Sequence, residues 1–131
     1  MANKYGEAAL IAARLEVPAS VTAAERWDTA VRQLYPEKPY LQRKTAPRGA
    51  FLGLCEQGLV KGVGGAGEGA GYGSGADQNR SYAVRAVALL QAGTHRSVNA
   101  LWAEVTAGEE VTHNAQMDVV LALWKNGLIV S

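Results

Sequence analysis

The sequence predicts an all-α protein of about six helices, and three observations support this prediction. Apolar residues recur at helical spacing in segments that are bounded by proline, glycine or capping residues. No segment alternates over enough residues to predict a long strand. The segments 51–60 and 120–129 share one pattern: an apolar helical run, two polar residues, Gly-Leu and a β-branched residue. We therefore expect two similar three-helix units, 4–61 and 77–130, joined by a glycine-rich loop, 62–75.

The first two predicted helices follow from periodicity and capping residues. The first spans about 4–17, with its apolar residues on one face, and ends at Pro18. Thr22 and Glu25 have the spacing of a capping box, which predicts the start of the second helix. That helix carries Trp27 on its apolar stripe and ends before the prolines at 36 and 39.

A polar pair on the second helix, Asp28 and Arg32, is four residues apart, so the two side chains can form a weak ion pair. Thr45 or Ala46 is expected to cap the third helix, with a proline near its first turn. This helix ends at Gly58, which we expect to be a left-handed C′ residue. Residues 62–75 then contain eight glycines and predict a flexible loop.

Three more helices are expected in the second unit. One opens at Asp77 or Asn79 and runs to Gln91, and its apolar interior predicts a central, buried helix. Ser97 caps a short helix with Trp102 on its inner face. Asn114 is expected to cap the last helix, which ends in Gly-Leu as the third does.

After each Gly-Leu, a short extended segment follows. Val60–Lys61 and 129–131 can form one very short strand pair, and the sequence predicts no other strands. The three tryptophans, Trp27, Trp102 and Trp124, lie on apolar stripes and are expected in the core.

Composition limits the possible function classes. A chain of 131 residues with 48% apolar residues and a net charge of +1 fits one folded domain, 1–131. The single cysteine, Cys55, excludes an internal disulfide and argues against a zinc cluster. No signal peptide and no apolar run of membrane-spanning length is visible, so we expect a cytoplasmic protein of bacterial type.

The charge is distributed unevenly along the chain. Residues 31–62 carry six Lys or Arg and two acids, whereas residues 97–131 carry one Lys and four acids. The candidate nucleic-acid-binding residues in the basic segment are Arg43, Lys44, Arg48 and Lys61. Their positive charges can hold phosphates, and the nearby Tyr40 can stack on a base. The alternative is a solvated loop whose charges maintain solubility.

A second candidate site lies around the start of the last helix. His113, Asn114, Gln116 and Asp118 can line a small-molecule pocket, although capping and solvent exposure also explain them. The match to GxGxxG at 62–67 lacks the preceding strand and following helix of a dinucleotide site, so it predicts no cofactor. No metal-ligand spacing and no catalytic set is visible.

The two Gly-Leu endings also resemble those of winged-helix and helix-turn-helix domains, in which the third helix reads DNA. The third helices here offer few positive side chains for that purpose. The segments 47–62 and 114–129, which read PRGAFLGLCEQGLVKG and NAQMDVVLALWKNGLI, resemble a family of short, uncharacterised bacterial proteins. The resemblance covers about residues 38–130, with Tyr72, Asn79 and Tyr82 fitting loosely, and it implies no activity.

From these observations we expect a non-catalytic binding module for a protein or nucleic-acid partner. The alternative is a small enzyme or small-molecule-binding protein with a polar site near the start of the last helix. No cofactor and no membrane contact are expected, and self-association remains open.

Overall fold

The computed structural model describes residues 4–18, 21–61, 76–107 and 115–130, so the predicted loop at 62–75 lies outside the described residues. Within these ranges the chain forms helices and no sheet, which confirms the all-α prediction. The helices are α1 (Tyr5–Arg14), α2 (Ala23–Leu34), α3 (Pro39–Gln42), α4 (Thr45–Glu56), α5 (Ala76–Ala92), α6 (Val98–Val105) and α7 (Gln116–Lys125). None of the helices in these ranges has the length and apolar character needed to cross a bilayer.

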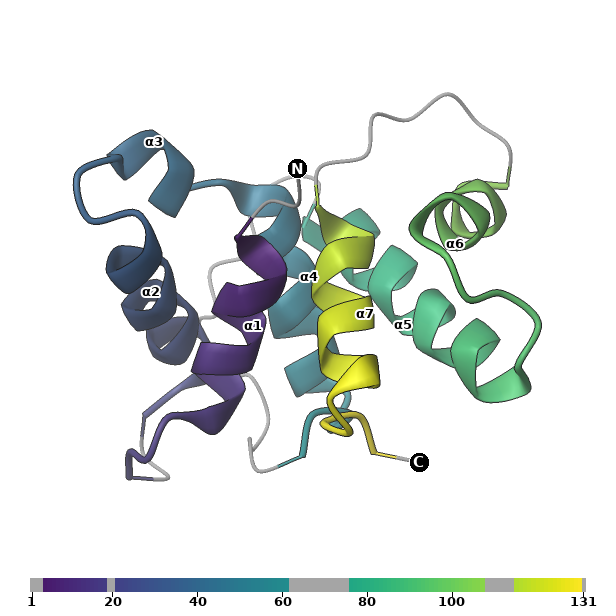
Figure 1. Ribbon diagram of the computed structural model, residues 1–131, viewed down its shortest axis with the longest axis horizontal. Helices are drawn as coiled ribbons and strands as arrows, with labels where there is room; N and C mark the ends of the chain where they lie inside the picture. The colour runs from purple at the N-terminus through teal and green to yellow at the C-terminus, as the bar shows by residue number, and fades with distance from the viewer. Residues whose placement is uncertain (1–3, 19–20, 62–75, 108–114, 131) are drawn as a thin grey trace.

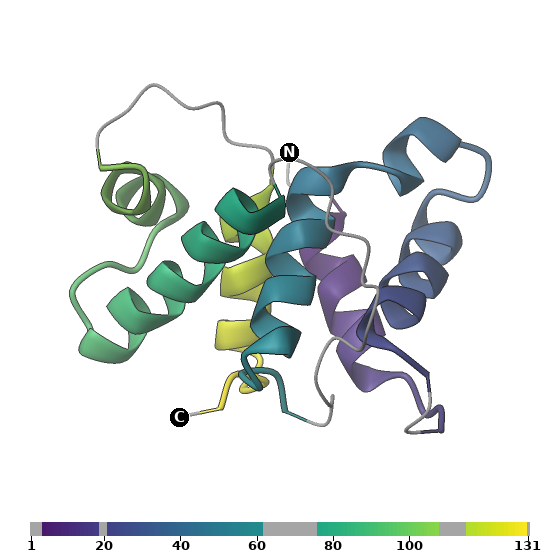
Figure 2. The ribbon, with the colours of Figure 1, turned by 180° about the vertical axis from the view of Figure 1, so that it is seen from behind.

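The helices form two layers, which are flanked by α2 and α3 on one side and by α6 on the other. Helices α1 and α7 pack against each other in one layer, and α4 and α5 pack in the layer behind them (Figure 1). Seen from behind, α4 and α5 lie in front, with α2 and α3 on one side and α6 on the other (Figure 2). Helices α4 and α7 also contact each other and occupy the centre of the arrangement.

Helix α4 is the central buried helix of the fold, and the expectation that this helix would be α5 was wrong. All seven residues from Gly49 to Cys55 are buried in α4. In α5, by contrast, Arg85 and Ala88 are exposed, and only one face packs on the core. The run 49–55 contains no polar residue, whereas Arg85 interrupts the apolar interior of α5. Of the tryptophans, Trp27 is fully buried and the other two are half-buried.

The two Gly-Leu endings have the predicted geometry. Gly58 has φ +70° and Gly127 has φ +71°, in the left-handed region that favours glycine. The amide of Leu59 donates to Leu54 O at 2.9 Å, and that of Leu128 donates to Leu123 O at 2.9 Å. These are the long-range bonds of a Schellman motif. Both leucines are half-buried and pack on the core.

The same two endings pair with each other through an isolated antiparallel bridge between Val60 and Ile129. Lys61 N–H donates to Leu128 O at 2.7 Å, and Val130 N–H donates to Leu59 O at 2.8 Å. The predicted strand pair is therefore present as a single bridge, which ties the ends of α4 and α7 together. A repeat of two complete three-helix units stays a prediction.

The predicted caps of α2 and α6 are confirmed. Thr22 and Glu25 form both bonds of the capping box, and the Ser97 hydroxyl accepts from Ala100 N at 3.1 Å. Helix α1 ends at Arg14 rather than 17. There the buried Arg26 donates from one guanidinium nitrogen to Ala12 O at 3.0 Å and Leu15 O at 3.2 Å. This bond satisfies carbonyls that the end of a helix leaves unpaired.

Three boundaries differ from the prediction. Helix α3 lies in the segment that was expected to be a connector, and the N-cap of α4 is Lys44. The N-cap of α7 is Ala115, which has φ +71°, instead of Asn114, a residue outside the described ranges. An alanine in this conformation gives no sequence signal, because left-handed backbone is uncommon for residues with a Cβ.

Substitution at the glycine C′ positions should destabilise the fold through backbone strain alone. An added Cβ at Gly58 or Gly127 meets no atom within 4 Å. We therefore expect Gly58→Ala and Gly127→Ala each to lower the free energy of unfolding by about 1 kcal/mol, measured by urea denaturation. Asparagine tolerates this conformation better, so Gly58→Asn should cost less; equal losses for Ala and Asn would contradict the strain argument.

A different constraint acts at Gly53, where α4 and α5 approach closely. A Cβ at this position would lie 2.4 Å from Arg80 Cγ and 2.7 Å from Arg80 Cα. The Arg80 guanidinium nitrogen Nη1 then reaches Glu56, at 2.9 Å from Oε1 and 3.0 Å from Oε2. Glycine at 53 therefore lets the stem of Arg80 lie flat across α4.

Gly53→Ala should consequently force α4 and α5 apart. Because the clash includes a backbone atom, we expect a loss of roughly 1–3 kcal/mol of unfolding free energy, as for other overpacked cores. Chemical denaturation measures it, and the double variant Gly53→Ala/Arg80→Ala separates the contributions. If Gly53→Ala proved as stable as wild type, the two helices would not be held this close in solution.

Candidate nucleic-acid interface

The short helix α3 forms a corner of the molecule between α2 and α4, and two hydrogen bonds hold it there. The Tyr5 hydroxyl, from α1, donates to Leu41 O at 2.8 Å. The Gln42 side-chain amide donates to Tyr35 O at 2.7 Å. A four-residue helix has little stability of its own, so these bonds to neighbouring elements fix its position.

Aromatic rings support the corner from beneath. The Tyr5 ring lies 6.4 Å from that of Trp27 and 5.3 Å from that of Tyr35, and Trp27 stacks at 5.3 Å on Phe51 of α4. Burial, with smaller contributions from Tyr35 and Tyr40, raises the pKa of Tyr5 to about 12. The phenol therefore stays protonated at neutral pH and remains the donor to α3.

Two lysines lie over these rings. Lys44 Nζ is 6.0 Å from the centroid of Tyr5, and Lys4 Nζ is 5.9 Å from that of Tyr35. At these distances the ring faces attract the ammonium groups. The rings of Tyr5 and Tyr35 therefore help to position the ammonium groups of Lys44 and Lys4 at this corner.

Next to α3 lies a surface cavity of about 370 Å³, lined by Asp28, Val31, Arg32, Gln42 and Arg43. The one acid in this lining already has a partner, since Arg48 Nε lies 3.5 Å from Asp28 Oδ1. Arg32 and Arg43 are exposed, and neither forms an ion pair with any residue that the structure describes. The cavity therefore presents two guanidinium groups to solvent.

The structure brings together three of the four predicted nucleic-acid-binding residues. Arg43, Lys44 and Arg48 lie at this corner, between the end of α3 and the first turn of α4. Lys61 follows the opposite end of α4, which is about 18 Å long at 1.5 Å per residue. The structure therefore separates Lys61 from the other three.

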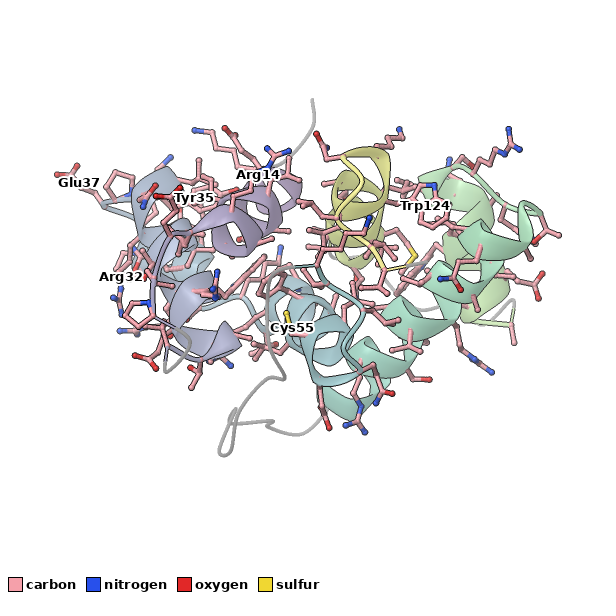
Figure 3. All side chains as sticks on the ribbon, turned by 90° about the horizontal axis from the view of Figure 1, so that it is seen from below. Arg14, Arg32, Tyr35, Glu37, Cys55 and Trp124 are labelled. Atoms are coloured by element: carbon pink, nitrogen blue, oxygen red, sulfur yellow. The ribbon has the colours of Figure 1, made fainter. Side chains whose placement is uncertain are left out.

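Arg32 lines the cavity beside this corner, and the sequence analysis did not select it as a binding residue. Its spacing from Asp28 predicted an ion pair, but the structure pairs Asp28 with Arg48 instead. Figure 3 shows Arg32 at the outer edge of the molecule, in the same half as Tyr35 and Glu37, with Cys55 in the interior and Trp124 in the other half. A long-range pair such as 28–48 leaves no signal in local spacing.

The second predicted site receives less support. His113 and Asn114 lie outside the described residues, and the other two members lie in the first turn of α7. Gln116 is buried, with 3% exposure, and Asp118 is half-buried with its carbonyl against Gly6 of α1. Asp118 therefore belongs to the packing between α1 and α7, and Gln116 is buried at the start of α7.

The described ranges also contain few side chains that could act in catalysis or bind a metal ion. They contain no cluster of three His, Cys, Asp or Glu residues that could hold a metal ion. Burial raises the pKa of the Cys55 thiol to about 12, against a smaller opposing effect of Arg26. A thiol that stays protonated is a poor nucleophile.

The bond from Tyr5 to α3 predicts a local effect of its removal. In Tyr5→Phe we expect about 1 kcal/mol less stability and faster hydrogen exchange at the amides of Gln42 and Arg43, which bond within α3. The exchange of the amide of Thr106, at the C-cap of α6, should not change. Tyr35→Phe is the control, because its hydroxyl accepts only an exposed contact from Lys4 N. Equal exchange in all three proteins would show that α3 does not depend on this bond.

Comparison with known proteins gives a family but no activity. Searches of curated proteins and of solved structures gave no significant match. A model of a protein family, described as "Family of unknown function (DUF6979)", matches residues 2–130. The chain therefore belongs to this family of unknown function, DUF6979.

Proposed function

We propose that the chain is a non-catalytic binding module that binds nucleic acid through its basic corner, formed by Arg32, Lys38, Arg43, Lys44 and Arg48. The observation that carries the proposal is the cavity beside α3, which presents two guanidinium groups without ion-pair partners in the described structure. Guanidinium groups bind phosphates with paired hydrogen bonds, and their charge persists at every physiological pH.

The number of cations favours a polyanion over a small ion. Between residues 28 and 48 the chain has five Lys or Arg and two acids, which leaves a local charge of +3. These cations lie on both sides of α3 and at the start of α4 rather than around one point. Successive phosphates of a nucleic acid strand provide a matching row of negative charge.

The packing of the helices favours contact with the backbone over reading of bases in a groove. Both helices that could serve as recognition helices, α4 and α7, lie in the centre of the fold. In α7 only Lys125 is exposed. A recognition helix needs a free face of polar side chains. The corner therefore supports sequence-independent binding, in which phosphates position the protein.

Such binding should be weak and salt-dependent. The whole chain has a net charge of +1, so long-range attraction adds little to the local contacts. We place the affinity in the micromolar range or weaker. A cytoplasmic location, where nucleic acid is accessible, belongs to this proposal.

The test measures fluorescence anisotropy of labelled oligonucleotides at several salt concentrations. With three phosphate contacts, the slope of log K against log salt should be about −3 for the wild type. Arg32→Ala/Arg43→Ala should reduce its magnitude by about two, because each contact contributes about one released counterion. Both side chains are exposed, so the variant should keep the circular dichroism spectrum of the wild type.

A matched control removes two exposed cations elsewhere. Arg96→Ala/Lys125→Ala lowers the net charge by the same amount in the other half of the chain and should leave the slope unchanged. No binding at about 50 mM salt, where phosphate contacts are strong, would overturn the proposal. Equal weakening in the two double variants would show that only net charge matters, and an acidic protein would then be the better candidate partner.

A further inference from the structure

Tyr40 is the large aromatic side chain that the described structure leaves most open to solvent. Its exposure is 71%, whereas the neighbouring Tyr5 is buried and Tyr35 is half-buried. No hydrogen bond or ring contact within the described residues involves it. The fold therefore does not need this ring for packing.

The backbone beneath the ring is fixed, although the ring itself is exposed. Tyr40 precedes Leu41 and Gln42, the two residues through which α3 is bonded to α1 and α2. A ring on an anchored helix loses little further freedom when a ligand stacks on it. Tyr40 thus has the properties of a preorganised stacking platform.

Its position relates it to the basic corner. Tyr40 and Arg43 are three residues apart on α3 and its C-cap, a spacing that places side chains on one side of a helix. Lys38 is the N-cap of the same helix. The exposed ring therefore lies next to positive charge, and an Arg beside it lines the cavity.

We infer that the ligand of this corner is single-stranded nucleic acid, with phosphates on Arg32 and Arg43 and an unpaired base stacked on Tyr40. This inference rests on the proposed function. Bases in a duplex are already stacked on each other, so a protruding ring finds no open face there. An unpaired base offers such a face whatever its sequence.

The test compares a labelled single strand, a duplex of the same sequence and a single strand with abasic positions. Wild type should bind the single strand about tenfold or more tightly than the abasic strand at equal salt. Tyr40→Ala should weaken binding to the single strand by roughly tenfold to a hundredfold, with little effect on the abasic strand and the duplex. Tyr40→Phe, which keeps the ring, should bind as wild type does.

The salt slope separates this inference from the proposed function. Tyr40→Ala removes no charge, so its slope should equal that of the wild type. If Tyr40→Ala binds the single strand like wild type while the Arg32/Arg43 variant still loses slope, the stacking inference fails and phosphate binding stands. If neither strand binds wild type at low salt, both fail. A fall in single-strand affinity in Tyr40→Phe equal to that in Tyr40→Ala would assign the effect to the hydroxyl and also overturn stacking.

Discussion

Complete burial of the middle of α4 is the constraint on which the rest of the structure depends. Residues 49–55 span nearly two helical turns, so every face of the helix there is covered. The cover comes from α5, α7 and α2, which must converge on one axis. The small residue Gly53 allows α5 to approach closely. The ring of Phe51 stacks on that of Trp27 from α2. Burial of so much apolar surface, at about 25 cal/mol per Å², provides the main driving force for this arrangement.

The shared Gly-Leu endings have a local explanation in this arrangement. The helices α4 and α7 lie side by side with their C-terminal ends at the same edge of the molecule (Figure 1). After each helix the backbone reverses direction at a left-handed glycine. The two segments that follow then pair through the bridge between Val60 and Ile129. The two hydrogen bonds of the bridge are reciprocal, so each ending needs the same geometry. This requirement accounts for the likeness of the two segments without a repeat of the complete units.

Local sequence signals predicted the helices well, and their failures have physical reasons. Caps and C-terminal glycines act through contacts within a few residues, so Thr22, Ser97 and Gly58 could be found from the sequence. Helix α3 could not, because contacts with Tyr5 and Tyr35 hold it. Helix α5 was expected to be a central, buried helix and is covered on one face only, since alanine-rich stretches such as that of α5 do not show which face is exposed. The acid–base pairing at the site, Asp28 with Arg48, depends on how α2 meets α4.

The basic corner follows from the same burial of α4. Because the middle of that helix excludes charge, the cations of the segment before it gather around α3 and its first turn. There Arg48 neutralises Asp28, while Arg32 and Arg43 line one cavity as like charges without partners in the described structure. Like charges held close together disfavour folding slightly, so this arrangement does not itself stabilise the fold. This is one reason for the proposal that the corner binds an anionic ligand. Residues 97–131 carry one Lys and four acids. Under the proposed function, this acidic segment adds no attraction for a polyanion, and the attraction at the corner acts within a Debye length of about 10 Å at 0.1 M salt.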